Sequence, residues 1–186
     1  MKRAFIIHGY TGHPTKNWFP WLKGELEQHG YQVEVPAMPH ADAPQLDEWL
    51  PYLGKCIGQP DRDTYLIGHS LGCITILRYL ESLPEGEQIA GTVLVAGFSR
   101  KIHFHELDNF FEQPLDYSKC AAATQAITCI NSTNDPHVPL EEGEVLRDKL
   151  GAKLIVIENG GHLNEKFGYT QLQIVLDEVL NFPHLD

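Results

Sequence analysis

Short runs of apolar residues alternate along the chain with longer segments in which apolar and polar positions recur at helical spacing. Such short runs predict buried strands, and the amphipathic segments predict helices that cover them. We expect strands at residues 4–8, 32–35, 64–68, 91–96, 126–131 and 153–158. We expect helices at residues 18–29, 46–57, 71–83, 141–150 and 172–181. The alternation predicts an α/β architecture, a mostly parallel sheet of about six strands with helices on both faces.

Residues 98–123 interrupt this regular alternation. They lie between two predicted strands and contain several aromatic residues in a broken helical pattern, and a crossover helix alone needs less chain. Two interpretations stay open for this segment: a small cap over a site, or an insertion that packs on the edge of the sheet. The proline-rich stretch 36–44 is predicted to be a connecting loop, so we expect a single domain over residues 1–186.

Composition agrees with one folded domain and narrows the class of partner. The chain has 186 residues, of which 42% are hydrophobic and 21% are charged, enough for a sizeable core. Its 14 Lys and Arg against 25 Asp and Glu give a net charge of −11. This charge provides no basic surface for a phosphate backbone or an anionic lipid, so we expect neither nucleic acid nor membrane as a partner.

Cysteine spacing and the N-terminal residues bear on the compartment. The four cysteines are separated by 17, 47 and 9 positions, which form neither a CxxC pair nor a dense disulfide framework. Four apolar residues follow Lys2 and Arg3 before His8, fewer than the apolar region of a signal peptide. Reduced thiols in a cytoplasmic protein are the expected reading, although spacing leaves disulfide pairing open.

The segment from residue 64 to 83 has the pattern of a nucleophile elbow. An apolar run ends in the motif GHSLG at 68–72, and apolar residues at helical spacing follow it. A serine on a sharp turn between a strand and a helix needs small flanking residues, because strand and helix approach closely there. The turn raises the Ser70 hydroxyl at the N-terminus of the helix, where free N–H groups favour a developing negative charge. Ser70 is therefore the candidate nucleophile.

A serine nucleophile requires a histidine base and an acid that orients it, in the chain order serine, acid, histidine. Asp135 follows the predicted strand 126–131 in a polar turn, and His162 follows the strand 153–158 after two glycines. Sites of open α/β sheets lie at the carboxyl ends of the strands, where both residues would meet Ser70. A histidine base predicts that activity falls as the imidazole protonates in acid solution.

The first predicted strand ends in a glycine-containing loop that completes the candidate site. We assign the backbone N–H groups of Tyr10 and Leu71 to an oxyanion hole. We also assign His8, Gly9 and Trp18 to substrate binding. Core packing is the alternative for Trp18, as for Trp21 and Trp49, because aromatic residues at helical spacing usually pack inward.

The remaining histidines are expected to have other roles. His69 neighbours Ser70, but side chains diverge at a sharp turn, so it is a poor candidate for the base. His137 is a rival base or, as we prefer, a loop residue. His103 and His105 with Glu106 provide no placed third ligand, so we expect no metal site. No cofactor is expected.

Several motifs taken together resemble a known superfamily. GHSLG at 68–72 and the residues around Asp135 and His162 resemble the α/β-hydrolases. The runs 8–12 (HGYTG) and 17–22 (NWFPWL), with 160–162 and 167–169, look like the small YdeN and retinoblastoma-binding-protein-nine-like serine hydrolases. The likeness extends over nearly the whole chain. It implies a three-layer α/β-hydrolase fold with a reduced sheet, a triad of Ser70, Asp135 and His162, and little or no lid.

The resemblance and the residues together predict a serine hydrolase without cofactor. The expected substrate is a small carboxylic ester, with a thioester or an amide as open alternatives, and the natural substrate is not defined by the resemblance. A second hypothesis comes from another class: a hydrolase-like scaffold whose main role is to bind a protein partner, with vestigial catalysis. An intact set of triad residues favours the enzyme, and no feature of the sequence indicates a protein partner.

Overall fold

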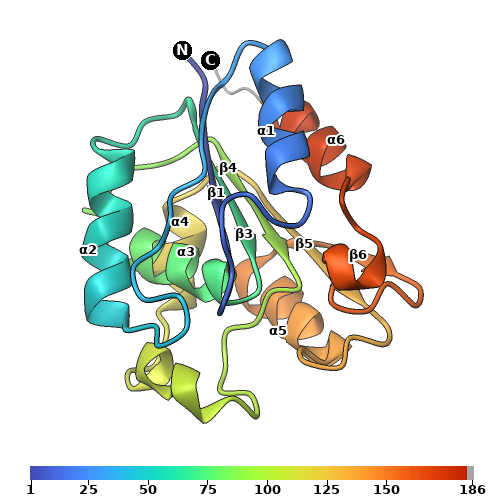
Figure 1. Cartoon of the computed structure of the whole chain (residues 1–186). Coiled ribbons are helices and arrows are strands. Elements are labelled where there is room, and N and C mark those ends of the chain that lie inside the picture. The colour runs from blue at the N-terminus through green and yellow to red at the C-terminus, as the bar shows by residue number, and fades with distance from the viewer. Residues whose placement is uncertain (184–186) are drawn as a thin grey trace.

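A computed structural model describes residues 1–183 of the chain as a six-stranded sheet between two layers of helices (Figure 1). The strands are β1 (Arg3–Ile7), β2 (Gln32–Glu34), β3 (Thr64–His69), β4 (Gly91–Val95), β5 (Ile127–Ser132) and β6 (Lys153–Ile157). The sheet has the order β2-β1-β3-β4-β5-β6, and each neighbouring pair is parallel. The expected strands and the three-layer α/β class are confirmed, and the sheet is parallel throughout the described residues.

Six α-helices and two short 3₁₀-helices connect the strands within residues 1–183. The α-helices are α1 (Phe19–Gln28), α2 (Leu46–Ile57), α3 (Leu71–Ser82), α4 (Tyr117–Ala122), α5 (Leu140–Leu150) and α6 (Gln173–Asn181). The 3₁₀-helices are η1 (His105–Phe111) and η2 (Glu165–Phe167). Five of the α-helices were expected, whereas α4 and η1 fall in the irregular segment 98–123.

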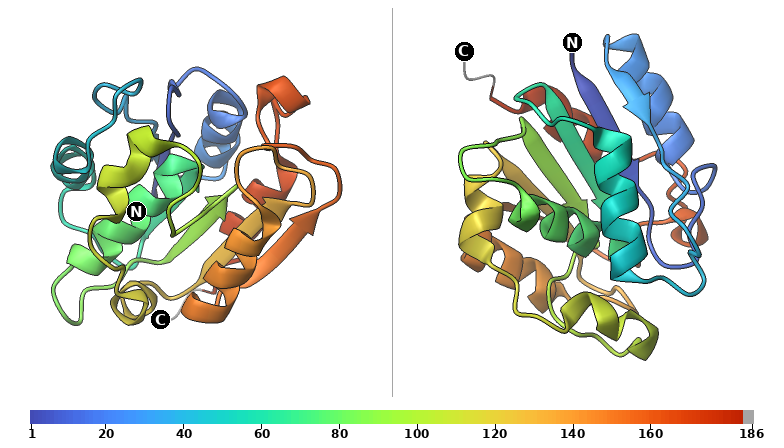
Figure 2. Two further views of the ribbon diagram at one scale, coloured as in Figure 1. Left: turned by 90° about the horizontal axis from the view of Figure 1, so that it is seen from below. Right: turned by 90° about the vertical axis from the view of Figure 1, so that its left-hand side faces the viewer.

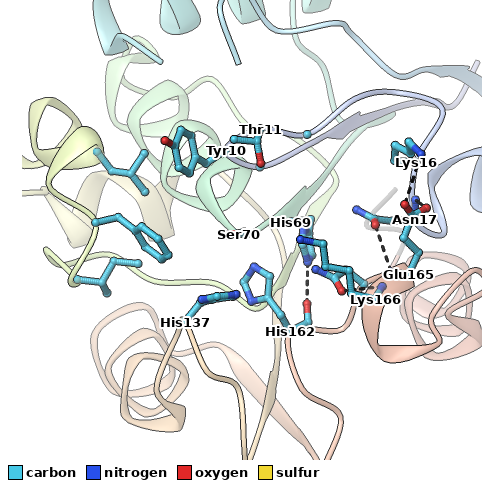
Figure 3. Close-up of a pocket in the computed structure, with 16 residues that line it drawn as sticks. Tyr10, Thr11, Lys16, Asn17, His69, Ser70, His137, His162, Glu165 and Lys166 are labelled. Atoms are coloured by element: carbon cyan, nitrogen blue, oxygen red, sulfur yellow. Dashed lines mark hydrogen bonds and ion pairs between the residues drawn. The ribbon is translucent and has the colours of Figure 1, made fainter. Parts of the chain in front are cut away.

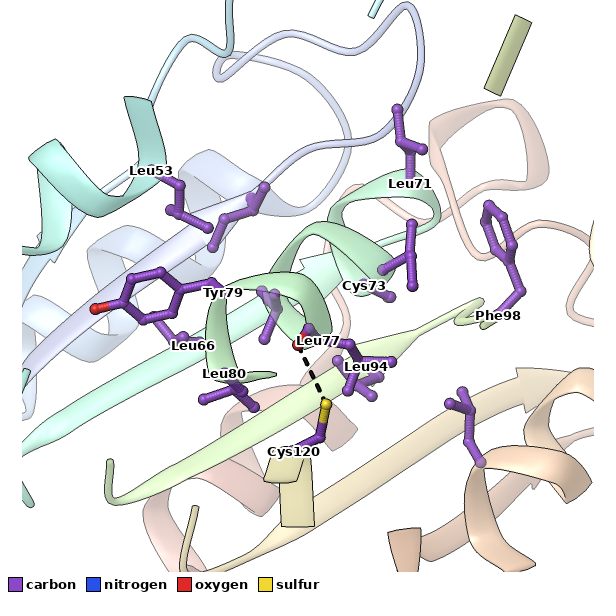
Figure 4. Close-up of a cluster of buried hydrophobic side chains, with 14 of the residues drawn as sticks. Leu53, Leu66, Leu71, Cys73, Leu77, Tyr79, Leu80, Leu94, Phe98 and Cys120 are labelled. Carbon is purple, nitrogen blue, oxygen red and sulfur yellow. Dashed lines mark hydrogen bonds between the residues drawn. The ribbon is translucent and has the colours of Figure 1, made fainter. Parts of the chain in front are cut away.

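Alternation along the strands divides the core into two clusters, one on each face of the sheet. Leu66 of β3 points into the cluster that α2, α3, α4 and α5 cover. Its neighbours Tyr65 and Ile67 point into the other cluster, which α1 and α6 cover. Figure 2 shows the two helical layers, and Figure 4 shows buried side chains of the first cluster. Because all strands run the same way, their carboxyl ends meet at one edge of the sheet.

The irregular segment 98–123 is fastened to the body of the domain (Figure 1, yellow-green and yellow). The buried guanidinium of Arg78 on α3 donates two 3.0 Å hydrogen bonds to the carbonyl of Phe110 and further bonds to the carbonyls of Gln113 and Pro114. Asn109 accepts a 2.7 Å bond from the N–H of Leu46 at the start of α2. These contacts hold η1 against α2 and α3, so the segment is packed onto the helices on this face of the sheet.

Two further features concern membrane-spanning helices and the cysteines. Among residues 1–183 no helix is long and apolar enough to span a membrane. The four cysteines carry no disulfide in the structure, and Cys73, Cys120 and Cys129 are buried. Burial raises the pKa of the Cys120 and Cys129 thiols to about 12, which keeps them protonated and unreactive.

Candidate active site

Ser70 lies on a strained turn between β3 and α3. Its backbone has φ 54° and ψ −119°, a conformation that residues with a side chain rarely adopt. A Cβ on Gly68 would come within 2.9 Å of the Cys73 backbone nitrogen, and a Cβ on Gly72 within 2.2 Å of the Ile7 carbonyl oxygen. Both glycines are therefore required by the close approach of strand and helix.

His162 and Asp135 meet beyond the ends of β6 and β5. The imidazole Nδ1 of His162 lies 2.8 Å from Oδ2 of Asp135, and the side chains are 9% and 1% exposed. The other carboxylate oxygen, Oδ1, accepts hydrogen bonds from the backbone N–H groups of His137 at 2.8 Å and Val138 at 3.1 Å. Because a carboxylate accepts, Nδ1 of His162 carries the proton, which leaves Nε2 of the neutral ring as an acceptor.

The environment of Asp135 keeps its carboxyl group ionised. Burial alone would raise the pKa of Asp135. The hydrogen bond and charge of His162 and the two backbone N–H donors all lower it, and together they outweigh burial. The pKa of Asp135 is consequently held below its usual value. An ionised acid at this position can stabilise a protonated His162.

Ser70 and His162 line one cavity of about 390 Å³, within the usual size range of small-molecule sites (Figure 3). One wall is mainly apolar and consists of Tyr10, Ile102, Phe104 and Leu107. The opposite wall is polar and consists of Lys16, Asn17, Asn164, Glu165 and Lys166. Segment 98–123 thus provides part of the apolar wall, while its second half forms α4 and packs into the core through Cys120.

The loop after β1 approaches Ser70 closely. A Cβ on Gly9 would lie 2.9 Å from Cβ of Ser70 and 3.5 Å from the backbone nitrogen of Leu71. Among residues 1–183, no hydrogen-bond acceptor is found for the backbone N–H of Tyr10 or of Leu71. Gly9 and Tyr10 both line the cavity, so the loop leaves unpaired N–H groups beside the serine.

His8 and Trp18 lie behind the site and do not line the cavity, in contrast to the expectation of substrate contact. His8 is 1% exposed, and it bonds the carbonyl of Gly9 through Nδ1 at 2.9 Å and the N–H of Met38 through Nε2 at 3.0 Å. Burial lowers the pKa of His8, in agreement with a neutral ring that donates on one side and accepts on the other. Trp18 is fully buried, and its indole N–H donates to the carbonyl of Leu163 at 3.0 Å.

Two further histidines flank His162 (Figure 3). The His69 ring lies 4.8 Å from the His162 ring, centroid to centroid, and its Nε2 is 2.9 Å from the backbone carbonyl oxygen of His162. On the other side the His137 ring lies 5.0 Å from it, edge to face. Burial and the neighbouring His162 lower the pKa of His137. Sequence reasoning gave neither histidine a part in the site, because neither contact follows from spacing along the chain.

The histidines considered for a metal lie apart from this arrangement. His105 is 91% exposed and its ring pairs with Asp108. The His103 ring stacks on Phe104 at a centroid distance of 4.1 Å. Across residues 1–183, no three His, Cys, Asp or Glu side chains come together in a group that could hold a metal ion.

Comparison with known proteins identifies the family. The family model described as "Serine hydrolase" matches residues 4–181. This chain belongs to the serine hydrolase family. The serine hydrolase is 36% identical to YdeN of Bacillus subtilis over 182 residues, which are 97% of this chain and 96% of YdeN. It is 28% identical over 178 residues to the serine hydrolase RBBP9 of Rattus norvegicus, 93% of each chain.

A solved structure supports the same assignment. The crystal structure of the ydeN gene product from B. subtilis superimposes on this serine hydrolase with a TM-score of 0.94 and 36% sequence identity, over 98% of each chain. The predicted resemblance to the YdeN and retinoblastoma-binding-protein-nine-like group is therefore confirmed. The protein is an α/β-hydrolase with a reduced sheet, and it is an enzyme of the serine hydrolase class.

Proposed function

We propose that this serine hydrolase cleaves small carboxylic esters through an acyl-enzyme intermediate, with Ser70 as nucleophile, His162 as base and Asp135 as the orienting acid. The observation that carries the proposal is the 2.8 Å pair of His162 and Asp135, because His162 lines the same cavity as the strained elbow serine. Three residues from three separate loops supply the groups that acyl transfer requires.

In the proposed reaction, the Ser70 oxygen attacks the carbonyl carbon of the ester while Nε2 of His162 takes the hydroxyl proton. The resulting oxyanion accepts hydrogen bonds from the backbone N–H groups of Tyr10 and Leu71. When the tetrahedral intermediate collapses, His162 gives the proton to the departing alcohol. Water then enters and its oxygen attacks the acyl carbonyl carbon while His162 takes its proton. When this second intermediate collapses, the bond to Ser70 breaks, the acid leaves and His162 returns the proton to the Ser70 oxygen. Asp135 stabilises the imidazolium at both stages, and the reaction draws on no metal or cofactor.

The cavity walls indicate the kind of ester. Tyr10, Ile102, Phe104 and Leu107 offer an apolar surface to a hydrocarbon group, whereas polar side chains line the opposite wall. A volume of about 390 Å³ accommodates a small molecule, so we propose a short apolar acyl or alkyl group on the first wall. Thioesters and amides pass through the same tetrahedral intermediate and are the alternative substrates. We also propose a cytoplasmic location for the enzyme, which the four unpaired cysteines support.

Labelling with a fluorophosphonate probe tests the catalytic assignment. The wild-type enzyme is expected to form a covalent adduct on Ser70, and Ser70→Ala is expected to lose both the adduct and the hydrolysis of p-nitrophenyl acetate. Ser118→Ala is the matched control, because Ser118 is an exposed serine on α4. Absence of labelling in the wild-type enzyme, or equal labelling of Ser70→Ala, contradicts the proposal. A series of p-nitrophenyl esters from acetyl to octanoyl then measures the depth of the apolar wall.

A further inference from the structure

The loop that carries His162 holds the residue next to it in a conformation that a leucine does not favour. Between β6 and η2, three residues have positive φ: Asn159 at 53°, Gly161 at 56° and Leu163 at 50°. Gly161 adopts this region freely and asparagine tolerates it, so Leu163 is the strained residue of the three, and a Cβ on Gly161 would come within 2.1 Å of the Phe167 ring. We therefore expect contacts from outside the loop to hold the backbone at Leu163 in place.

Two buried side chains supply such contacts to adjacent carbonyls of the loop. Nε2 of His69, the last residue of β3, lies 2.9 Å from the carbonyl oxygen of His162. The indole N–H of Trp18, the residue that precedes α1, donates at 3.0 Å to the carbonyl of Leu163. His69 is 4% exposed and Trp18 is fully buried. These bonds tie the His162 loop directly to the elbow strand and to the first helix.

His69 acts here as a neutral donor. A carbonyl oxygen only accepts, so Nε2 of His69 carries the proton. The ring packs edge-on against Trp18 at 6.1 Å, Phe19 at 6.0 Å and His162 at 4.8 Å between centroids. Burial, together with the neighbouring His162, lowers the pKa of His69 to about 3, so the ring stays neutral at the pH values where a histidine base works. Asp135 and the His162 carbonyl oppose this shift and His8 adds to it, but burial dominates.

We propose that His69 and Trp18 are positioning residues that hold the backbone of His162 and Leu163, and thereby set the place at which Nε2 of His162 reaches the Ser70 hydroxyl. The inference rests on the proposed function, and it assigns the orientation of the His162 ring and the position of its backbone to different residues. Asp135 orients the ring about its own bonds, whereas the two carbonyl contacts fix the backbone from which the ring projects. A displacement of about 1 Å in such a site costs about 100-fold in rate, so loss of either contact lowers kcat.

A matched pair of substitutions separates this positioning role from simple packing. His69→Gln keeps a side-chain N–H at a similar reach, whereas His69→Met has a similar length and no donor. We expect His69→Met to lower kcat about 10-fold to 100-fold with KM within about twofold, and to slow fluorophosphonate labelling by the same factor. His69→Gln is expected to recover most of the loss. Thermal melting of both variants reports how far the fold itself is weakened.

Trp18→Phe provides the second arm, since it removes the indole donor and keeps an aromatic ring. Trp49→Phe is its control: Trp49 is equally buried and donates at 2.7 Å to the carbonyl of Pro39, away from the His162 loop. Trp18→Phe is expected to lower kcat about 10-fold, and Trp49→Phe is expected to stay within about twofold of the wild type at a similar loss of melting temperature.

Several outcomes overturn the proposal. One is a wild-type kcat in a folded His69→Met protein. Another is an equal loss of kcat in His69→Gln and His69→Met, and the third is an equal kcat in Trp18→Phe and Trp49→Phe. If His69→Met does not fold, the comparison of Trp18→Phe with Trp49→Phe decides. In each case the wild-type enzyme still labels at Ser70. Failure of the proposed function itself is distinct, because the wild-type enzyme then does not label or hydrolyse esters at all.

Discussion

Burial of a neutral histidine next to the elbow predicts a specific loss of stability in acid. The pKa of His69 is lowered from 6.5 to about 3, chiefly by burial and secondarily by His162. In the unfolded chain the same imidazole is exposed and titrates near its ordinary value. Between these two pKa values the unfolded state binds one proton more than the folded state. The free energy of unfolding therefore falls as the pH falls through this window.

The size of the effect follows from the two pKa values. With a folded value of about 3 and an unfolded value of 6.5, His69 alone lowers the free energy of unfolding by about 2.5 kcal/mol between pH 7 and pH 4.5. The lowered pKa of Asp135 acts in a different window, because that contribution is lost only as the pH approaches and falls below about 4. His8 and His137, whose pKa values are also lowered, add to the loss with the same sign as His69.

Urea unfolding at pH 7 and about pH 4.5 measures this contribution. His69→Gln carries no titrating group at the position, so its decrease in stability between the two pH values should be smaller than that of the wild type by about 2.5 kcal/mol. His29→Gln is the control, because it replaces an exposed histidine at the end of α1, and its decrease should match the wild type. If His69→Gln and the wild type lose the same stability, the buried neutral state of His69 is wrong.

Three further substitutions test the site. Asp135→Asn should lower kcat about 10⁴-fold with little change in KM, because a neutral amide cannot stabilise the imidazolium and its N–H can favour the wrong tautomer of His162; less than a tenfold loss in steady-state assays argues against this role. Gly9→Ala places a Cβ 2.9 Å from that of Ser70 and should lower kcat at least tenfold, whereas Gly24→Ala, with open space around it, should keep wild-type kinetics. Phe104→Ala should shift kcat/KM toward longer acyl chains in the ester series, by up to about fourfold for each added methylene. An unchanged preference places the acyl group elsewhere.

The periodic parts of the fold were predictable from the sequence because they depend on local spacing. The six strands and five of the helices lie within one residue of their expected bounds. The same logic brought Ser70 and His162 to one cavity and Asp135 into contact with His162, since each residue follows a strand of a parallel sheet. The helix α4 was missed because six residues in a broken pattern provide too little periodicity.

Contacts between residues far apart in the chain were the part that spacing could not provide. His69 was set aside because its side chain was expected to diverge from that of Ser70, yet its partner is a backbone carbonyl 93 residues away. Trp18 was assigned to substrate with core packing as the alternative; it is fully buried in the core, and its indole also bonds a carbonyl 145 residues away. A buried aromatic or histidine gives the same signal in sequence whether it only packs or also donates a hydrogen bond. The distinction becomes visible only when the partner is located.

The turn that carries Ser70 and the loop that carries His162 are held in their strained conformations by different contacts. Ser70 and Ala96, both with positive φ, follow inner strands, and their N–H groups donate to the carbonyls of Val95 and Ile130 on the neighbouring strands at 2.9 and 2.8 Å. The His162 loop follows β6, the edge strand of the sheet, and its N–H groups at Asn159 and Gly161 donate to the side chains of Thr133 and Asn134 after β5, at 3.0 and 2.8 Å. The side chains of His69 and Trp18 donate in addition to two carbonyls of this loop, so side chains take the place of a strand backbone. Such strain costs about 1–3 kcal/mol per residue and must be offset by other contacts. The Ser70 turn obtains them from the neighbouring strands of the sheet, whereas the His162 loop obtains them from individual side chains.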